Sequence, residues 1–467
     1  MIKKNQEIEI DENDIFKNDK LQRKDSIEDL SKLIISNTEP LVLSINASWG
    51  SGKTTFVKLW QTYLKKEYKV NSIYFSAWED DFSKEPLISI LGEIKKYINE
   101  EFHADQKVEE SFEKVKNIGG KVLKRGIPAF LKGITAGVVD FDKGFEEALG
   151  AIAESSAKEL IDNYSKDKEI TIEFKSSIEE LLSKINNETP FVIFIDELDR
   201  CRPLYSIELL ERIKHIFGIK KLIFVLSIDK SQLSESIKSQ YGNIDTDNYL
   251  RRFIDLEYYL NNPKLDDFSY YLYSEVYQFN KIFKSKNIIK QYDSSLDELA
   301  MIKYLIKSLN FNLREIEQLF LQLNIIFSTV NLRLFESHFR IIVLFVILRM
   351  KLPNEYELLK IGKINIQKLI DLLVPNKLGD ENNHLKLIIK AVILATGKNE
   401  EELNEVIKKE KEILSEINEN YEKHIHQRLI NLLELDHGNS GYYRLNSLIE
   451  TVIKKVEFAD RFNFETV

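Results

Sequence analysis

The chain has 467 residues, 43% of them hydrophobic, which is enough for a large buried core and, at ordinary domain sizes, for two or three domains. Its 66 lysines and arginines against 75 aspartates and glutamates give a net charge of −9, so overall electrostatics does not draw the chain to nucleic acid or anionic lipid. The single cysteine, Cys201, excludes an intramolecular disulfide, and the N-terminus lacks the apolar run of a secretory signal. These features predict a cytoplasmic protein.

Short apolar runs alternate with amphipathic segments through the first half of the chain. The predicted strands are residues 41–46, 72–76, 191–195 and 222–228. The predicted helices are residues 53–68, 85–98, about 173–185 and 204–217. Near-continuous apolar strands separated by amphipathic helices indicate an α/β fold with a parallel sheet covered by helices on both faces.

The regular alternation stops between about residues 102 and 170. Within this segment, the apolar run at 126–139 contains Lys132, so we expect a soluble insertion, with interfacial membrane contact as the minor alternative. Beyond Pro263, Leu/Ile/Lys/Glu patterns predict an all-helical remainder. The expected domains are therefore residues 1–262, which include the insertion, and residues 263–467.

Two segments of the helical remainder have alternative interpretations. The apolar run at 341–348 is too short to span a membrane and predicts a buried helix. Residues 400–417 carry opposite charges at helical spacing, which favours a solvated amphipathic helix over a helix that binds a partner. His424 and His426 would diverge on a helix, so they predict no metal site.

Residues 47–54, ASWGSGKT, lie between the first predicted strand and the first predicted helix. They match the phosphate-binding pattern G-x-x-x-x-G-K-[ST] except at Ala47. The two inner glycines would let the backbone wrap around phosphate, while Lys53 would neutralise the phosphate charge and the Thr54 hydroxyl would bind Mg²⁺. The predicted ATP-binding residues are Ala47, Ser48, Trp49, Gly50, Ser51, Gly52, Lys53, Thr54 and Thr55.

A second motif follows the strand predicted at 191–195, in the sequence FVIFIDELDR. Asp196 is placed to hold Mg²⁺, usually through water, and Glu197 is the natural candidate to polarise the attacking water. Asp199 is the competing base, or else a structural partner for Arg200 or Arg202. Together with the lysine-containing loop, these carboxylates predict a site for Mg²⁺ and ATP.

Arginine is scarce in the chain, with 14 arginines against 52 lysines, but Arg200, Arg202, Arg212, Arg251 and Arg252 fall close together. The rigid guanidinium is favoured for phosphate and for fixed carboxylate pairs, so we expect structural ion pairs and one or two γ-phosphate sensors. Arg252 is one such candidate.

Two further residues complete the predicted catalytic set. Arg314, on the helical side of the chain, is a candidate second sensor of the nucleotide. Asp229, at the end of the strand predicted at 222–228, either senses the γ-phosphate or caps the helix that follows, and the sequence does not choose between these roles.

The motifs, in this order, resemble the KAP family of P-loop NTPases. The resemblance rests on WGSGKT at 49–54, FSAWED at 75–80 and FIDELDRCRP at 194–203. It continues through the strand that ends at Asp229, through YLRRFI and through the Arg314 helix, and it covers most of residues 15–325. The family usually has glycine in place of Ala47 and often aspartate in place of Glu197.

The resemblance implies an additional-strand P-loop fold with a helical C-terminal extension, Mg²⁺-dependent ATP hydrolysis and switch-like behaviour. Many relatives carry membrane-spanning helices between the two nucleotide motifs, but the apolar runs of this insertion are too short to span. Some bacterial relatives are linked to phage exclusion, which favours antiviral defence as the context. Cys201 falls within the family's Asp-Arg-Cys signature and is interpreted as a packing residue.

The leading hypothesis is an ATPase whose nucleotide state repositions the helical region or the insertion against a protein partner or effector. The first alternative is a scaffold that binds ATP without hydrolysing it and assembles into a homo-oligomer. The second is a nucleic-acid-dependent motor, disfavoured by the net charge, although Lys114, Lys116, Lys121, Lys124 and Arg125 could form a local basic patch. A small-molecule kinase is least favoured, since no acceptor pocket is recognisable.

Overall fold

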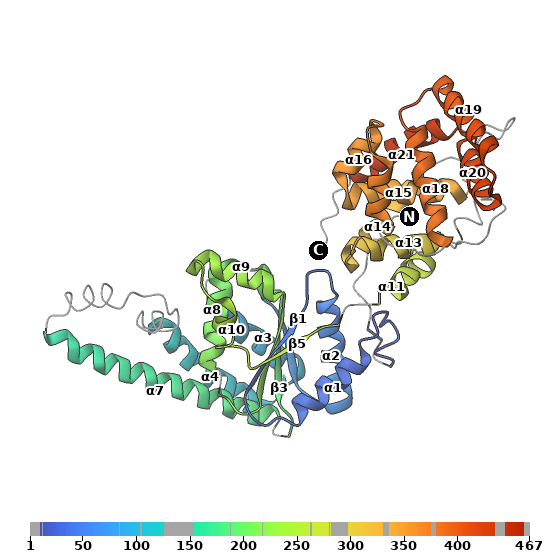
Figure 1. The fold of residues 1–467 in the computed structure, drawn as a ribbon. Helices are drawn as coiled ribbons and strands as arrows, with labels where there is room; N and C mark the ends of the chain where they lie inside the picture. The colour runs from blue at the N-terminus through green and yellow to red at the C-terminus, as the bar shows by residue number, and fades with distance from the viewer. Residues whose placement is uncertain are drawn as a thin grey trace. The chain divides into compact units, whose positions relative to one another are not determined.

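The computed structural model describes residues 10–11, 13–83, 85–102, 105–125, 154–186, 188–216, 218–261, 264–279, 281, 298–329, 336–374, 380–434 and 444–461. The chain divides into two compact units, Ile8–Asn262 and Pro263–Val467, and each is described by itself (Figure 1). The apolar run at 126–139, predicted to be a soluble insertion, lies outside the described residues.

The first unit is built on a five-stranded sheet with the strand order β2-β3-β4-β1-β5. Every neighbouring pair of these strands is parallel. The strands are β1 (Leu41–Asn46), β2 (Ser72–Ser76), β3 (Phe191–Asp196), β4 (Leu222–Ile228) and β5 (Leu256–Tyr259). The predicted parallel sheet is therefore confirmed, and β5 adds an edge strand that the sequence analysis did not predict.

Alternating side chains of the central strands enter two separate cores. Val192 and Phe194 of β3 pack on one face with Trp60, whereas Ile193 and Ile195 pack on the other. Since both faces are buried, β3 and β4 are apolar at consecutive positions, and every residue of both strands is buried. This double burial is why the two strands could be predicted from short apolar runs.

Helices cover both faces of the sheet. The core around Trp60 is closed by α1 (Lys24–Ile35) and α2 (Lys53–Tyr68). The opposite core is closed by the remaining helices of the unit. These are α3 (Pro86–Glu101), α4 (Gln106–Arg125), α7 (Glu154–Ile185), the 3₁₀ turn η1 (Leu198–Arg200), α8 (Pro203–Ile216), α9 (Lys230–Tyr241) and α10 (Thr246–Leu250).

The insertion between the nucleotide motifs contains two long helices, where the sequence analysis expected the regular pattern to stop. α4 packs along α7, and α7 begins at Glu154, well before the predicted start near residue 173. Gly119 and Gly120 both lie within α4. A Cβ at Gly119 would stand 3.1 Å from the Phe174 ring, so glycine here permits close packing of the two helices.

All regular elements among the described residues of the second unit are helical. Its elements are α11 (Leu265–Tyr271), the π-helical turn η2 (Leu272–Val276), α13 (Glu298–Ser308), α14 (Leu313–Thr329), α15 (Glu336–Lys351), α16 (Pro353–Lys360), α17 (Ile366–Leu373), α18 (Asp380–Ala395), α19 (Glu400–Glu416), α20 (Asn420–Leu433) and α21 (Leu445–Asp460).

Two helices of this unit were predicted from the sequence. The apolar run at 341–348 is buried within α15, as predicted. Residues 400–416 form the predicted amphipathic helix α19, which begins at a capping box made by Asn399 and Glu402. Among the described residues, no helix is both long and apolar enough to cross a membrane.

Candidate functional site

The carboxyl ends of three neighbouring strands come level at one edge of the sheet. Asn46, the last residue of β1, is in register with Ile228 at the end of β4. Asp196, the last residue of β3, is in register with Ser227 of β4. The loops that leave these strands carry the predicted motifs, so the topology brings them to one edge, where ligands of open parallel sheets bind.

The loop after β1 has the backbone of a phosphate-binding turn. Gly50 and Gly52 have φ values of 73° and 83°, in the left-handed region that glycine adopts without a Cβ clash. Lys53 begins α2, and Thr54 and Thr55 lie in its first turn, where backbone N–H groups have no partner within the helix. The Lys53 ammonium donates to the carbonyl oxygens of Ala47, at 2.7 Å, and Ser48, at 3.2 Å.

Trp49 connects this loop to two acidic residues. Its backbone N–H donates to Oδ2 of Asp229 at 3.1 Å, and its indole Nε1 donates to Oδ2 of Asp199. Asp229 also caps α9, because its Oδ1 accepts from the backbone N–H groups of Ser231 and Gln232. The predicted capping role of Asp229 is confirmed, and its role in sensing phosphate stays a prediction.

The carboxylates at the end of β3 have different surroundings. Asp196 is 1% exposed and accepts hydrogen bonds from the Tyr74 hydroxyl, at 3.1 Å, and from the Glu197 N–H, at 2.9 Å. Glu197 accepts from the Ser76 hydroxyl at 3.3 Å and forms an ion pair with Arg200 at 2.8 Å. Its φ of 62° is unusual for a residue with a side chain, and such backbone outliers concentrate at functional sites.

Burial dominates the electrostatics of this site. Desolvation lowers the pKa of Lys53, and the nearby carboxylates of Asp199, Asp229 and Asp196 oppose this effect. Desolvation also raises the pKa values of Glu197 and Asp199. The lysine therefore lies among acidic side chains in partly water-excluded surroundings, where charges interact more strongly than in water.

Several buried polar atoms of the site have no hydrogen-bond partner among the described residues. The hydroxyls of Ser51 and Ser227 and Oδ1 of Asp199 are buried without a hydrogen-bond partner among the described residues. Such atoms are costly to bury unless a ligand or ordered water meets them.

The protein groups fit a Mg²⁺ ion that is held mainly by a nucleotide. Magnesium typically takes one or two protein oxygens and completes its shell with phosphate oxygens and water. Asp196 and Thr54 offer a donor set of that kind. No group of three or more His, Cys, Asp or Glu side chains suited to a metal occurs in the described parts of the chain.

Three of the clustered arginines form ion pairs. Arg200 pairs with Glu197 and lies over the Trp78 ring, with its Cζ 5.6 Å from the ring centroid. Arg202 pairs with Asp81, and Arg212 makes two 2.6 Å hydrogen bonds to the Glu85 carboxylate. The ion-pair interpretation is confirmed for these three residues. Asp199, expected to be a possible partner of Arg200 or Arg202, instead accepts from Trp49.

The remaining arginines of the prediction belong to other elements. Arg251 and Arg252 follow α10 and are exposed. Arg314 belongs to α14 of the second unit, so its role as a sensor stays a prediction. Cys201 is 6% exposed, and burial raises the pKa of its thiol, which fits the packing role expected for it.

Two residues of the site escaped the sequence analysis. Tyr74 lies on β2 and reaches Asp196, 122 positions further along the chain. Arg23, just before α1, is 3% exposed and donates to the Ser51 carbonyl inside the loop at 3.3 Å. No local pattern marks either residue, because each partner is supplied by a distant segment.

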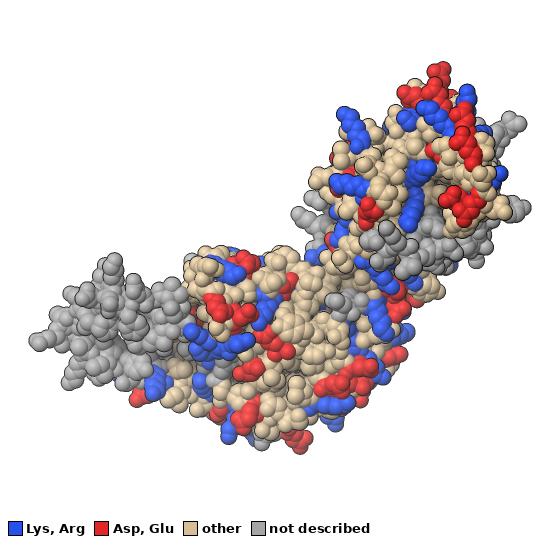
Figure 2. All heavy atoms as spheres, in the orientation of Figure 1, with Lys and Arg blue, Asp and Glu red and all other residues tan. Residues whose placement is uncertain are grey.

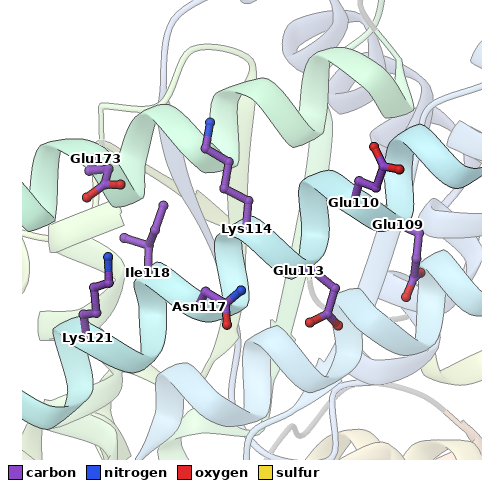
Figure 3. A pocket seen from close by; sticks show the side chains of 8 residues that line it. All are labelled: Glu109, Glu110, Glu113, Lys114, Asn117, Ile118, Lys121 and Glu173. Carbon is purple, nitrogen blue, oxygen red and sulfur yellow. The ribbon is translucent and has the colours of Figure 1, made fainter.

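A surface hollow of about 530 Å³ lies along α4 and α7, and it contains none of the predicted site residues (Figure 3). Its charged lining is mostly acidic, which disfavours a phosphate ligand. It is lined by Glu109, Glu110, Glu113, Lys114, Asn117, Ile118, Lys121 and Glu173. The nucleotide motifs and this hollow are therefore separate features of the first unit.

Comparison with known families identifies the class of this protein. Residues 23–330, more than half of the chain, match the KAP family P-loop domain. The chain belongs to that family, and its fold is that of a P-loop NTPase with a helical C-terminal region. The resemblance inferred from the motifs is thus confirmed, and nucleotide binding is the activity that this class shares.

Other comparisons add less. No curated protein matches the sequence. A structure described as the Aeropyrum pernix ORC2 protein, with ADPNP and ADP complexes, is similar over 94% of this chain and 95% of its own, at 12% identity and a TM-score of 0.33. A similarity this low carries no argument about function.

Proposed function

We propose that this protein is a Mg²⁺-dependent ATPase whose nucleotide state acts as a switch on a protein partner or effector. The observation that carries the proposal is the convergence of Lys53, Asp196 and Glu197 at one edge of the sheet. A lysine-bearing loop at a helix N-terminus binds phosphate, and two carboxylates beside it provide what hydrolysis requires.

Each residue has a distinct role in this proposal. Lys53 exchanges its hydrogen bonds to the Ala47 and Ser48 carbonyls for the β- and γ-phosphates. Thr54 and Asp196 hold Mg²⁺, which when bound neutralises the charge that develops on the phosphates. Glu197 accepts a hydrogen bond from the attacking water and orients it.

The surroundings of Glu197 suit that role. Desolvation raises its pKa, and the Arg200 guanidinium opposes this rise. A base with a pKa closer to neutrality accepts a proton more readily than an ordinary carboxylate, while the ion pair and Ser76 fix its direction. Asp229, which accepts from the Trp49 N–H, is the candidate for sensing the γ-phosphate, and Arg252 and Arg314 are the candidate arginine sensors.

The proposal is tested by ATP hydrolysis and ATP binding in matched variants. Lys53→Ala and Asp196→Ala should abolish turnover, whereas Glu197→Gln should bind ATP and turn it over slowly. Lys65→Ala is a control on the same helix, because Lys65 is exposed and pairs only with Glu101 among the described residues. Equal turnover by wild type and Glu197→Gln would remove Glu197 from the role of base.

The alternative of a non-hydrolysing scaffold that forms homo-oligomers uses the same residues. Light scattering with ADP and with a non-hydrolysable ATP analogue separates the two. A scaffold assembles with the analogue and releases negligible phosphate, whereas the proposed ATPase releases phosphate at a steady rate. A pull-down with Glu197→Gln against Lys53→Ala would identify a partner bound only in the ATP state, including one that acts in antiviral defence.

A nucleic-acid-dependent motor is less favoured. On the face in Figure 2, acidic and basic side chains are interspersed over the described surface. In the suggested basic patch, Lys114 pairs with Glu180 and Lys116 with Glu113, and the side chains of Lys124 and Arg125 lie outside the described residues. Stimulation of hydrolysis by nucleic acid at low salt would revive this hypothesis. The cytoplasmic location expected from the single cysteine stays a prediction.

A further inference from the structure

Arg23 joins two segments that are far apart in the sequence. Its Nη1 donates to the Asn261 carbonyl at 2.6 Å, and its Nη2 donates to the Ser51 carbonyl at 3.3 Å. The side chain is 3% exposed. One buried guanidinium thus contacts both the phosphate-binding loop and the segment that follows β5.

The contact with Ser51 affects the geometry of the loop. In a trans peptide, the C=O and the following N–H point in opposite directions. Holding the Ser51 carbonyl therefore sets the direction of the Gly52 N–H, which is one of the donors that such a loop offers to phosphate. Gly50 and Gly52, on either side, are both in left-handed conformations, which residues with a side chain rarely adopt.

The contact with Asn261 lies where the chain leaves the first unit. β5 pairs with β1, and the Leu260 N–H donates to the carbonyl of Asn46, the last residue of β1, at 3.0 Å. The segment after β5 therefore runs beside the start of the nucleotide loop. Asn261 is the last described residue before the chain continues into the second unit.

Arginine is well suited to link two backbone carbonyls. Its planar fork can donate to two carbonyls at once, which a lysine ammonium on a flexible stem does less well. The buried Nε has no hydrogen-bond partner among the described residues, so hydrogen bonds to these residues do not fully offset the cost of burying the guanidinium. Burial lowers the pKa of Arg23, and the Asp19 carboxylate opposes this effect.

We propose that Arg23 is a positioning residue that orients the Ser51–Gly52 peptide for phosphate and couples nucleotide occupancy of the loop to the segment at 256–261. This inference rests on the proposed nucleotide site and adds a route by which occupancy reaches the segment leading to the helical unit.

The test measures amide hydrogen exchange in peptides covering 47–54 and 256–261, with and without saturating Mg²⁺ and a non-hydrolysable ATP analogue, in the full-length protein. Nucleotide affinity is measured separately by calorimetry. The variants are Arg23→Met, which removes both donors, and Arg23→Lys, which keeps the charge. Tyr258→Phe is the control, because it removes the hydrogen bond that joins β5 to Ser26 of α1 at 2.9 Å and leaves both Arg23 donors in place.

In wild type and Tyr258→Phe, nucleotide should slow exchange in both peptides. Arg23→Met should bind nucleotide about tenfold more weakly and, once saturated, slow exchange at 47–54 only. If Arg23→Met does not fold, Arg23→Lys carries the same expectation. A full response at 256–261 in a saturated Arg23 variant, or no response there in saturated wild type, overturns the inference alone. Failure of wild type to bind nucleotide overturns the proposed function as well.

Discussion

Replacing Asp229 distinguishes the two roles that the sequence left open for it. Asp229 is 6% exposed, caps α9 and accepts the Trp49 N–H. Loss of a helix cap costs about 1 kcal/mol, and loss of a hydrogen bond to a charged acceptor costs about 1.5 kcal/mol or somewhat more. Asp229→Ala should therefore destabilise the first unit by about 2–3 kcal/mol.

Asp229→Asn is the matched variant. Asparagine caps helices about as well as aspartate, so this variant should lose less than about 1 kcal/mol, mainly because the acceptor no longer carries charge. If Asp229 acts only as a cap, ATP turnover in Asp229→Asn should stay within about twofold of wild type. If Asp229 also senses the γ-phosphate, turnover should fall more than about tenfold at nearly unchanged stability.

Urea unfolding followed by tryptophan fluorescence is the appropriate assay. All three tryptophans, Trp49, Trp60 and Trp78, belong to the first unit, and Trp60 is fully buried between its helices and sheet. The signal therefore reports the unit that contains Asp229. Equal destabilisation by Asp229→Asn and Asp229→Ala would refute the capping interpretation.

Further predictions concern the other charged groups of the first unit. Glu197→Gln should lower kcat at least about a hundredfold while ATP affinity changes little, and single-turnover kinetics check this. Arg212→Ala should destabilise the unit by about 2–3 kcal/mol, because it leaves the Glu85 carboxylate unpaired at a partly buried position; a double-mutant cycle with Glu85→Ala should recover part of the loss, and additive effects would contradict the pairing. Burial raises the pKa of Asp199, so the folded state binds a proton more tightly than the unfolded state and stability falls as pH rises from 3.8 through the folded pKa. Asp199→Asn should therefore become more stable relative to wild type across that window, and parallel pH profiles of the two proteins would count against the shift.

Much of the first unit follows from local sequence. The strands β3 and β4 are apolar at nearly every position because both faces of the sheet are covered, so short runs such as FVIFI were enough to predict them. The loop at 47–54 was recognisable because phosphate binding requires glycine, lysine and threonine at fixed spacing along one strand-to-helix connection. The buried strands and the phosphate-binding loop each depend on residues that are close together in the chain, so they can be predicted from the sequence alone.

The insertion shows where local reasoning failed. Glycine disfavours helices, so Gly119 gives no local signal for one. The structure instead places Gly119 within α4, against the Phe174 ring of α7. The preference of a single residue was outweighed by the packing of two helices, and a partner helix from a later segment cannot be read from the spacing around Gly119.

The partners of the site residues were decided only by tertiary structure. The sequence placed Asp196, Glu197, Arg200 and Arg202 in one motif. It did not show which carboxylate each of these arginines would contact. Arg202 pairs with Asp81, across 121 positions, and Arg23 reaches Asn261, across 238. Spacing along a chain fixes the local backbone and the residue types at a strand end. Ion pairs and buried hydrogen bonds depend on which strands lie side by side. The tertiary structure sets that strand order, and spacing along the chain does not reveal it.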